Sequence, residues 1–589
     1  QRMAQPRITD VKVQVDIFPK ERDFAFKGNY WVKNKTKEVI DSVMITLSED
    51  AEVKKLAFNR AAKVVHQNDD LSTRFFRLEQ PLQPGDSMKL DFDIFYETKG
   101  FKNSGNNTDI VYNGTFINSQ YLPDIGYSEN WELGDDDTRK EHDLKPKERM
   151  AALTDSVARQ NTYISSSADW INFEATVSTT PDQIAIAPGY LQREWQENGR
   201  RYFHYKMDSP ILNFYSFLSA RYEVKKDKWV DKDGKEVAIE IYYNKGHEYN
   251  LDRMIKGVKR SLDYYTANFS PYQHRQVRIL EFPGYQTFAQ AFPNTIPYSE
   301  AIGFIAKVDD NDPEDVDYPF YVTAHEIAHQ WWAHQVIGGN VQGGTLLSET
   351  MSQYSALMVM KKEYGPERMK KFLEYEMDDY LMGRSMESKK ELPLYKVENQ
   401  QYIHYNKGSV VMYALADYIG EDRLNAALAA YIKEVGFQEA PYTNSLDFLR
   451  HIKQATPDSL QYLVTDMFEN ITLYENKADE VTWSKQKDGR YKVKLTVDAK
   501  KFYADSLGTE RDARMNDYVD IGVLARKKVN GHWQDVTLVM QKKRLSAGKN
   551  TFEFVVNEKP EKAGIDPFNK LIDRNPDDNV KKAEEKKAA

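Results

Sequence analysis

The periodicity of the apolar residues changes twice along the chain, and this is the strongest constraint on its fold. Near the N-terminus apolar and polar residues alternate, as at Val11, Val13, Val15 and Ile17. Alternation is typical of half-buried β-strands, because successive side chains point to opposite faces of a sheet. We therefore expect an antiparallel β domain over residues 1–222.

From residue 223 the period becomes that of helices. Met254, Val258 and Leu262 follow one another every four residues, as on the buried face of a helix. Further stretches with this pattern cover residues 318–337, 346–363, 365–382, 408–434 and 443–470. The pattern predicts a mainly helical domain over residues 223–475.

Alternation returns at Tyr491, Val493 and Leu495, with Gly and Asn turn signals between the apolar runs. We expect a small β-sandwich over residues 476–572 and a charged tail over 573–589, because the last residues carry almost no apolar side chain. A chain of 589 residues is too long for one core. The predicted fold class is therefore multi-domain α+β.

Composition excludes several classes of function. The chain has no cysteine, so disulfides, thiolate metal sites and cysteine nucleophiles are excluded, and a metal must bind to His, Asp or Glu. The net charge of −9 comes from interspersed charges without a basic stripe, so we expect no nucleic-acid binding.

The sequence shows no apolar run of about 18–20 residues and no signal peptide at its start. We expect the chain as given to be soluble. Because it begins with Gln rather than Met, we also expect that a leader or a longer parent preceded it.

The strongest local motif is HEIAH at residues 325–329. In a helix His325 and His329 lie one turn apart on the same face, where both imidazoles can reach one ion at about 2.0–2.1 Å. Glu326 projects about 100° away from His325, beside the metal, where its carboxylate can accept a proton from water. An accidental H-E-x-x-H is expected on the order of once in a hundred chains of this length. The motif therefore predicts a zinc site.

A catalytic zinc ion takes three protein ligands and leaves a position for water. Glu349 opens the next predicted helix after the glycine-rich connection IGGNVQGG, and is the expected third ligand. His334 is the competing ligand. It lies five residues beyond His329 and points to another face, so we interpret it as structural.

The segments HEIAHQWW and LSETMSQYS resemble the zinc signature of the aminopeptidase N family of zinc metallopeptidases, which are gluzincins. In that family eighteen residues separate the second histidine from the glutamate, whereas here residues 330–348 separate His329 from Glu349. The resemblance implies a thermolysin-like helical catalytic domain between an N-terminal β domain and a small β domain. Too few residues remain for the large C-terminal helical domain that many members carry.

Two further family motifs can be placed on the chain. The segment Tyr405-Asn406-Lys407-Gly408 is similar to the family's Y-x-K-G, whose tyrosine stabilises the oxyanion of the reaction. Residues 297–303 keep the glutamate of the family's G-A-M-E-N-W-G motif as Glu300, and the resemblance implies that Glu300 binds the substrate's free α-amine. The loop at 113–127 is expected to face the active site by the same analogy.

Together these features predict an aminopeptidase that uses one zinc ion to remove N-terminal residues from peptide substrates. Two alternatives stay open. One is an endopeptidase or oligopeptidase, because the amine-binding motif is altered. The other is an inactive zinc-containing module that binds peptides or regulates a membrane transporter, since similar bacterial proteins are fused to a transporter-like permease. In that case the chain is the soluble domain of a bacterial membrane protein, with an attached or associated permease as its partner.

Overall fold

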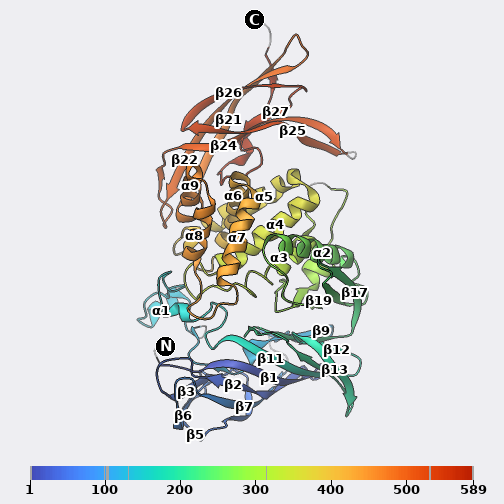
Figure 1. Ribbon diagram of the computed structural model, residues 1–589, viewed down its shortest axis with the longest axis vertical. Coiled ribbons are helices and arrows are strands. Elements are labelled where there is room, and N and C mark those ends of the chain that lie inside the picture. Colours follow the sequence, from blue (N-terminus) through green and yellow to red (C-terminus); the bar gives the residue numbers. More distant parts are fainter. Residues whose placement is uncertain are drawn as a thin grey trace. The chain divides into compact units, whose positions relative to one another are not determined.

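The computed structural model describes residues 3–98, 100, 105–129, 132–312, 315–529 and 532–586 (Figure 1). The chain divides into two compact units. The first unit comprises residues 1–307, 317–348 and 432–444, and the second comprises residues 308–316, 349–431 and 445–589.

An eight-stranded sheet is the largest element of the first unit. Its order is β13-β14-β11-β1-β2-β7-β4, with β15 paired to β11. These strands are β1 (Arg7–Phe18), β2 (Asp23–Lys33), β4 (Glu52–Phe58), β7 (Ser87–Tyr96), β11 (Ala168–Thr179), β13 (Tyr190–Glu197), β14 (Arg200–Lys206) and β15 (Ile211–Leu212). One pairing departs from the predicted antiparallel pattern: β1 and β11 run parallel, because a long excursion of the chain separates them.

Two smaller sheets complete this β region, with orders β10-β3-β6-β5 and β12-β16-β9-β8. Their strands are β3 (Ile40–Thr46), β5 (Ala62–Asn68), β6 (Thr73–Leu82), β8 (Ile110–Val111), β9 (Gly114–Asn118), β10 (Asp124–Ile125), β12 (Ile184–Ile186) and β16 (Ser216–Ala220). Short helical segments lie between strands: η1 (Ser119–Tyr121), α1 (Asp136–Glu141) and η3 (Ala158–Gln160).

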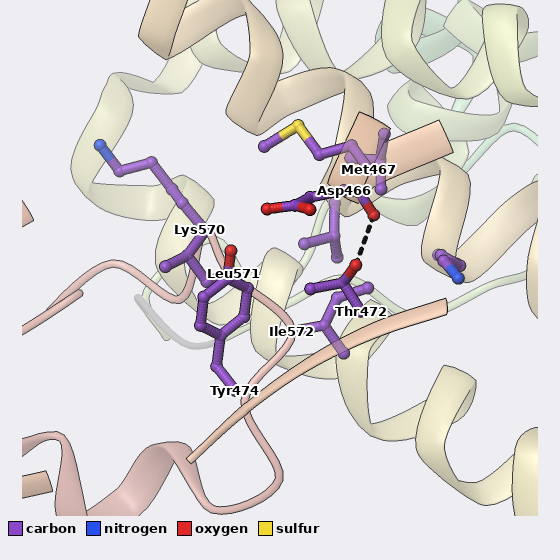
Figure 2. Close-up of a pocket in the computed structure, with 10 residues that line it drawn as sticks. Asp466, Met467, Thr472, Tyr474, Lys570, Leu571 and Ile572 are labelled. Atoms are coloured by element: carbon purple, nitrogen blue, oxygen red, sulfur yellow. Dashed lines mark hydrogen bonds between the residues drawn. The ribbon is translucent and has the colours of Figure 1, made fainter. Parts of the chain in front are cut away.

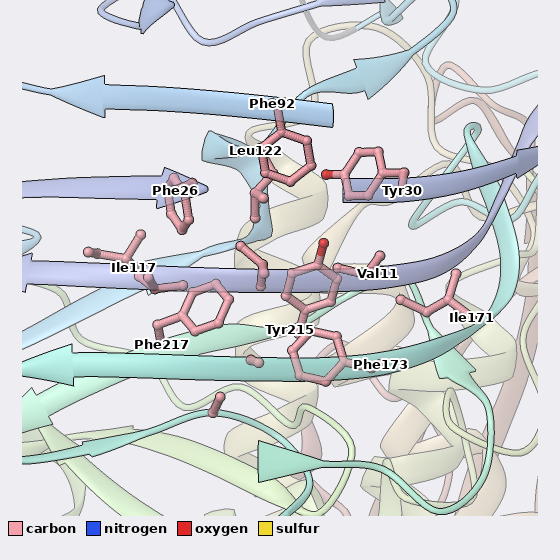
Figure 3. Close-up of a cluster of buried hydrophobic side chains, with 14 of the residues drawn as sticks. Val11, Phe26, Tyr30, Phe92, Ile117, Leu122, Ile171, Phe173, Tyr215 and Phe217 are labelled. Atoms are coloured by element: carbon pink, nitrogen blue, oxygen red, sulfur yellow. The ribbon is translucent and has the colours of Figure 1, made fainter. Parts of the chain in front are cut away.

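The alternating apolar residues of these strands form one large buried cluster. Figure 3 shows part of it, where aromatic rings from different strands gather. The ring of Tyr30 lies 4.9 Å from that of Phe92, and the ring of Phe173 lies 4.6 Å from that of Tyr215. The alternation at Val11, Val13, Val15 and Ile17 therefore matches the face that β1 buries.

A fourth sheet of the first unit lies in the same part of the chain as the main helices of this unit. It contains β17 (Tyr222–Val230), β18 (Glu236–Asn244), β19 (Gln276–Phe282) and β20 (Thr295–Ser299), in that order. Strands β18, β19 and β20 are parallel neighbours, so their carboxyl ends meet at one edge. The helical segments of this region are α2 (Leu251–Asn268), the π-helical η4 (Glu300–Phe304) and α3 (Tyr318–Ala328).

Helix α3 begins and ends for identifiable reasons. The Asp317 side chain accepts a hydrogen bond from the Phe320 amide at the start of the helix. The predicted helix over 318–337 is wrong at its end, because α3 stops at Ala328. Beyond it the amides of Gln330 and Trp331 donate to carbonyls three residues earlier, and Ala333 has a φ of 154°, which a helix cannot contain.

The second unit contains most of the helices. They are α4 (Met351–Tyr364), α5 (Pro366–Ser385), η6 (Leu394–Lys396), η7 (Tyr402–Lys407), α6 (Gly408–Ile419), α7 (Glu421–Val435), α8 (Ser445–Ala455), η8 (Asp458–Leu460), α9 (Gln461–Val464) and η9 (Thr465–Glu469). The π-helical segment η5 (Leu346–Thr350) leads directly into α4. None of the described helices is both long and apolar enough to span a membrane.

Two sheets follow in the second unit. Their orders are β23-β22-β21-β29, with β26 paired to β22, and β25-β24-β27-β28. The strands are β21 (Ile471–Lys485), β22 (Tyr491–Ala504), β23 (Glu510–Asp512), β24 (Asn516–Val529), β25 (His532–Ser546), β26 (Gly548–Val556), β27 (Lys562–Ile565), β28 (Val580–Lys582) and β29 (Glu584–Glu585), with η10 (Pro576–Asp578) before β28. Both sheets contribute to one apolar cluster, as in a sandwich.

The predicted fold class is confirmed, because a β region, a helical region and C-terminal β-sheets follow one another along the chain. The boundaries drawn at 222, 475 and 572 stay predictions. The segment 573–589, expected to be a charged tail, contains two short strands, β28 and β29. Backbone pairing explains the difference, since edge strands need no apolar side chains: the Lys586 amide donates to the Trp483 carbonyl at 2.8 Å.

Candidate metal centre and active site

His325 and His329 lie at the C-terminal end of α3, and both are buried. Their Nε2 atoms are 3.0 Å apart and face each other. The Nδ1 of His329 lies 2.9 Å from the carbonyl oxygen of Trp332 and donates to it, which leaves Nε2 with its lone pair available. The arrangement presents two imidazole nitrogens to one ion.

Glu349 completes this group. It lies in η5, and one of its carboxylate oxygens is within 4.8 Å of ligand nitrogens of His325 and His329. Two histidines and one carboxylate are a common ligand set for catalytic zinc. The residues predicted from the sequence as metal ligands are therefore brought together by the fold.

The glycine-rich connection that precedes Glu349 is held by the segment 151–163. The amide of Asn340 donates to the carbonyl of Asn161 at 2.8 Å, and the hydroxyl of Tyr163 donates to Ser348 Oγ at 2.7 Å. A Cβ atom on Gly344 would lie 3.0 Å from the backbone oxygen of Gly339, so this turn favours glycine. Sequence reasoning missed Tyr163, and no local signal marks it.

Glu326 follows His325 in α3 and is buried, with about 5% of its surface exposed. Its position on the helix, one residue from a metal ligand, matches that expected for a base beside the metal. His334 is buried and lies elsewhere: its Nε2 donates to the carbonyl of Ala291 at 3.0 Å. Burial lowers the pKa of His334 to about 4, so it stays neutral, consistent with its structural interpretation.

Glu300 is the first residue of η4, at the end of β20. Its Oε1 accepts a hydrogen bond from the amide of Gly284 at 2.8 Å, and its Oε2 accepts one from Asn113 Nδ2 at 3.1 Å. Asn113 opens the loop 113–127, which was expected to face the active site. The structure thus connects this loop to Glu300.

Tyr405 lies in η7 and is partly buried. The hydroxyl of Thr350, the residue after Glu349, donates to the carbonyl of His404 at 2.6 Å. A Cβ atom on Gly408 would lie 2.6 Å from Thr350 Oγ1. The glycine of the Tyr405–Gly408 motif therefore permits the close approach of η7 to the segment that carries Glu349.

The asparagine and lysine of the same motif make buried contacts. Asn406 Nδ2 donates to Glu376 Oε2 at 2.9 Å. Lys407 is 1% exposed and its Nζ lies 3.8 Å from Glu391 Oε1. Burial lowers the pKa of Lys407 and raises the pKa of Glu376 to about 8. The motif therefore anchors Tyr405 through a buried polar network.

A pocket in the second unit is lined by Lys407, two residues after Tyr405, and by residues within 410–411, 466–474 and 570–572 (Figure 2). Figure 2 shows Asp466, Met467, Thr472 and Tyr474 around it, with the Thr472 hydroxyl donating to the Asp466 carbonyl at 2.7 Å. Its lining includes none of the predicted metal ligands or catalytic residues. This pocket is therefore not the candidate active site.

Comparisons with known proteins agree with the geometry. Residues 252–468 match the peptidase family M1 domain. Human endoplasmic reticulum aminopeptidase 2 is 22% identical over 220 residues, which are 35% of this chain and 22% of that protein. The matched part therefore spans about a fifth of the length of this curated relative.

Solved structures share the fold. An M1 zinc metallopeptidase from Deinococcus radiodurans, bound to the substrate Tyr-Ser-Ala, aligns with a TM-score of 0.55 and 14% identity over 80% of this chain and 94% of that chain. Legionella pneumophila aminopeptidase A, in complex with aspartic acid, aligns with a TM-score of 0.60 and 13% identity over 100% of this chain and 60% of that chain.

The matched residues 252–468 contain the whole His325–His329–Glu349 group. The predicted resemblance is confirmed at the level of the family, and zinc is the metal that both the family and the ligand set indicate. Residues 252–468 therefore match peptidase family M1, and the solved M1 structures that share the fold are zinc metallopeptidases.

Proposed function

We propose that the chain is a zinc-dependent aminopeptidase that removes N-terminal residues from peptides. The observation that carries this proposal is the grouping of His325, His329 and Glu349 around one point, with Glu326 next to the first ligand. The relatives solved with Tyr-Ser-Ala and with aspartic acid support substrates of this class.

In this proposal His325, His329 and Glu349 hold the zinc ion. A bound zinc ion would polarise the scissile carbonyl and lower the pKa of water to about 7. Glu326 accepts the proton of the attacking water and passes it to the leaving amine. Because α3 holds Glu326 in a buried position, its carboxylate does not have to be ordered during the reaction.

Two further residues have proposed roles. The Tyr405 hydroxyl donates a hydrogen bond to the oxyanion that develops on the substrate carbonyl, and loss of one such donor typically lowers the rate by about 10²–10³-fold. Glu300 accepts hydrogen bonds from the substrate's α-ammonium group. Its orientation is supported by the hydrogen bonds from Gly284 and Asn113.

The experiment compares an amino-acid amide that has a free amine with its N-acetylated form, on wild type and on Glu326→Gln. We expect cleavage of the free amide alone, and we expect Glu326→Gln to keep its zinc and lose about 10²–10⁴-fold in turnover. His325→Ala should lose the zinc ion of this group and, with it, activity. Unchanged hydrolysis by Glu326→Gln would contradict the assignment of Glu326 as the base.

The same assay separates the alternatives. Equal cleavage of the free and the acetylated substrate would favour an endopeptidase or oligopeptidase and remove the proposed role of Glu300. Zinc binding without cleavage of any peptide would favour an inactive module.

An attached or associated membrane permease is a further proposal, supported by the family resemblance alone. Determining the full reading frame that encodes the chain tests it. A reading frame without membrane-spanning segments, together with recovery of the protein from the soluble fraction, would contradict it.

A further inference from the structure

A second group of metal-binding residue types lies at the edge of the sheet that carries Glu300. His247 follows β18, Glu281 lies near the end of β19, and Glu300 follows β20. Because these three strands are parallel neighbours, their carboxyl ends place the three side chains at one edge. The side chains come from separate parts of the chain and converge only in the folded sheet.

The ligand atoms of this group are close enough for one ion. His247 Nδ1, one oxygen of Glu281 and one oxygen of Glu300 all lie within 4.8 Å of one another. His247 Nδ1 lies 3.9 Å from Glu300 Oε2 and is in direct hydrogen-bond contact with Glu281 Oε1. Ligands about 2.0–2.2 Å from a tetrahedral ion lie roughly 3.3–3.6 Å apart, so an ion would replace the hydrogen bond between His247 Nδ1 and Glu281 Oε1.

The backbone orients both carboxylates. The amide of Asn244 donates to Glu281 Oε2 at 2.6 Å, and the amide of Gly284 donates to Glu300 Oε1 at 2.8 Å. In each case the other oxygen faces His247. Such outer hydrogen bonds are typical of metal ligands, whose geometry they fix. Asn113 Nδ2 also donates to Glu300 Oε2, at 3.1 Å, and would have to share this oxygen with an ion.

Charge and burial favour a cation at this point. The Glu281 side chain is fully buried, whereas 18% of Glu300 and 28% of His247 are exposed, so the group is open to solvent on one side. Among the described residues, no lysine or arginine forms an ion pair with either carboxylate.

We propose that His247, Glu281 and Glu300 form a second site for a divalent transition-metal ion such as Zn²⁺, separate from the His325–His329–Glu349 group. One imidazole and two carboxylates suit such ions, and the open side leaves room for water ligands. A consequence rests on the proposed function: an ion at this site occupies the oxygen with which Glu300 would bind the substrate's α-amine, so excess metal inhibits.

Metal stoichiometry tests the site without reference to activity. The full chain is stripped with chelator and titrated with Zn²⁺, and bound zinc is measured after equilibrium dialysis. We expect two ions on the wild type, and one on each of His325→Ala, His247→Ala and Glu281→Gln. Glu281→Gln keeps an acceptor for its backbone hydrogen bond, which guards against a folding defect.

His204→Ala is the matched control, because His204 Nε2 lies 3.0 Å from Glu174 in a pair with one carboxylate, and this variant should still bind two ions. One ion on the wild type, or two on both His247→Ala and Glu281→Gln, would overturn the site. This outcome is distinct from failure of the proposed function, since a chain without peptidase activity would still give a zinc count.

The inhibitory consequence has its own readout. On the wild type, zinc sufficient to fill the second site should raise the KM for an amino-acid amide at least fivefold, with a smaller change in kcat. An unchanged KM when two ions are bound would overturn the shared role of Glu300.

Discussion

Replacement of Gly408 by alanine probes how closely the Tyr405 segment approaches the residue next to Glu349. The new Cβ would lie 2.6 Å from Thr350 Oγ1 and 2.7 Å from its Cγ2, whereas ordinary contacts begin at 3.4 Å. The two segments must therefore separate by about 0.8 Å, the difference between 3.4 and 2.6 Å. Overpacking of this kind costs about 1–3 kcal/mol, of which the better helix propensity of alanine offsets about 1 kcal/mol.

The larger effect is expected on activity. A displacement of about 1 Å in a catalytic group can cost about 10²-fold in rate, so we expect Gly408→Ala to lower kcat/KM for an amino-acid amide by about 10–100-fold. Gly134→Ala is the control, because a Cβ at Gly134 meets nothing within 4 Å. It should leave kcat/KM unchanged and stability within about 0.5 kcal/mol.

A double-mutant cycle identifies the contact. Thr350→Ala removes Oγ1 and Cγ2, which are the two nearest atoms to the new Cβ. In that background Gly408→Ala should cost at least about 1 kcal/mol less in free energy of unfolding than in wild type. A kcat/KM of Gly408→Ala within threefold of wild type, or an equal effect in both backgrounds, would refute the role of this contact.

Three further changes test other parts of the structure. Tyr163→Phe removes the hydrogen bond to Ser348 and should weaken zinc affinity by about 10–100-fold, measured by chelator competition; unchanged affinity would contradict the supporting role of this bond. Burial raises the pKa of Glu376 from 4.5 to about 8, so its carboxyl keeps a proton in the native state that the unfolded chain has lost, and stability should fall as pH rises through this window. Glu376→Gln should reduce this pH-dependent loss of stability by several kcal/mol, measured as a smaller difference in Tm between pH 5 and pH 8.5. An unchanged difference in Tm would contradict the role of Glu376. Lys501→Met leaves two buried carboxylates without their cation and should cost about 3–5 kcal/mol in thermal unfolding, whereas Lys500→Met removes only an exposed pair and should lower Tm far less.

The candidate site was predictable where its geometry is local. His325 and His329 could be paired from spacing alone, because a helix brings residues four apart onto one face. Glu349 was expected from its place at the start of the next helix, but the path of the glycine-rich loop that brings it to the histidines does not follow from spacing. The structure holds that loop through Tyr163 and Asn161, which are distant in sequence and carry no motif.

One feature shared by three site residues had no sequence signature. Glu300, Glu349 and Tyr405 all lie in short π-helical segments, which are uncommon and are often found at functional sites. A π-helical turn depends on which backbone groups pair after packing. The periodicity of the apolar residues therefore does not predict such a turn.

The fold class followed from the sequence because the period of the apolar residues reports which face of each element is buried. The sequence by itself also determined the metal-binding residue types, since a chain without cysteine must use His, Asp or Glu. Only the tertiary structure decided where α3 ends, which strands pair in parallel, and which side chains meet at the edge formed by β18, β19 and β20. These features depend on contacts between residues far apart in the chain, and local propensity and periodicity contain no information about such contacts.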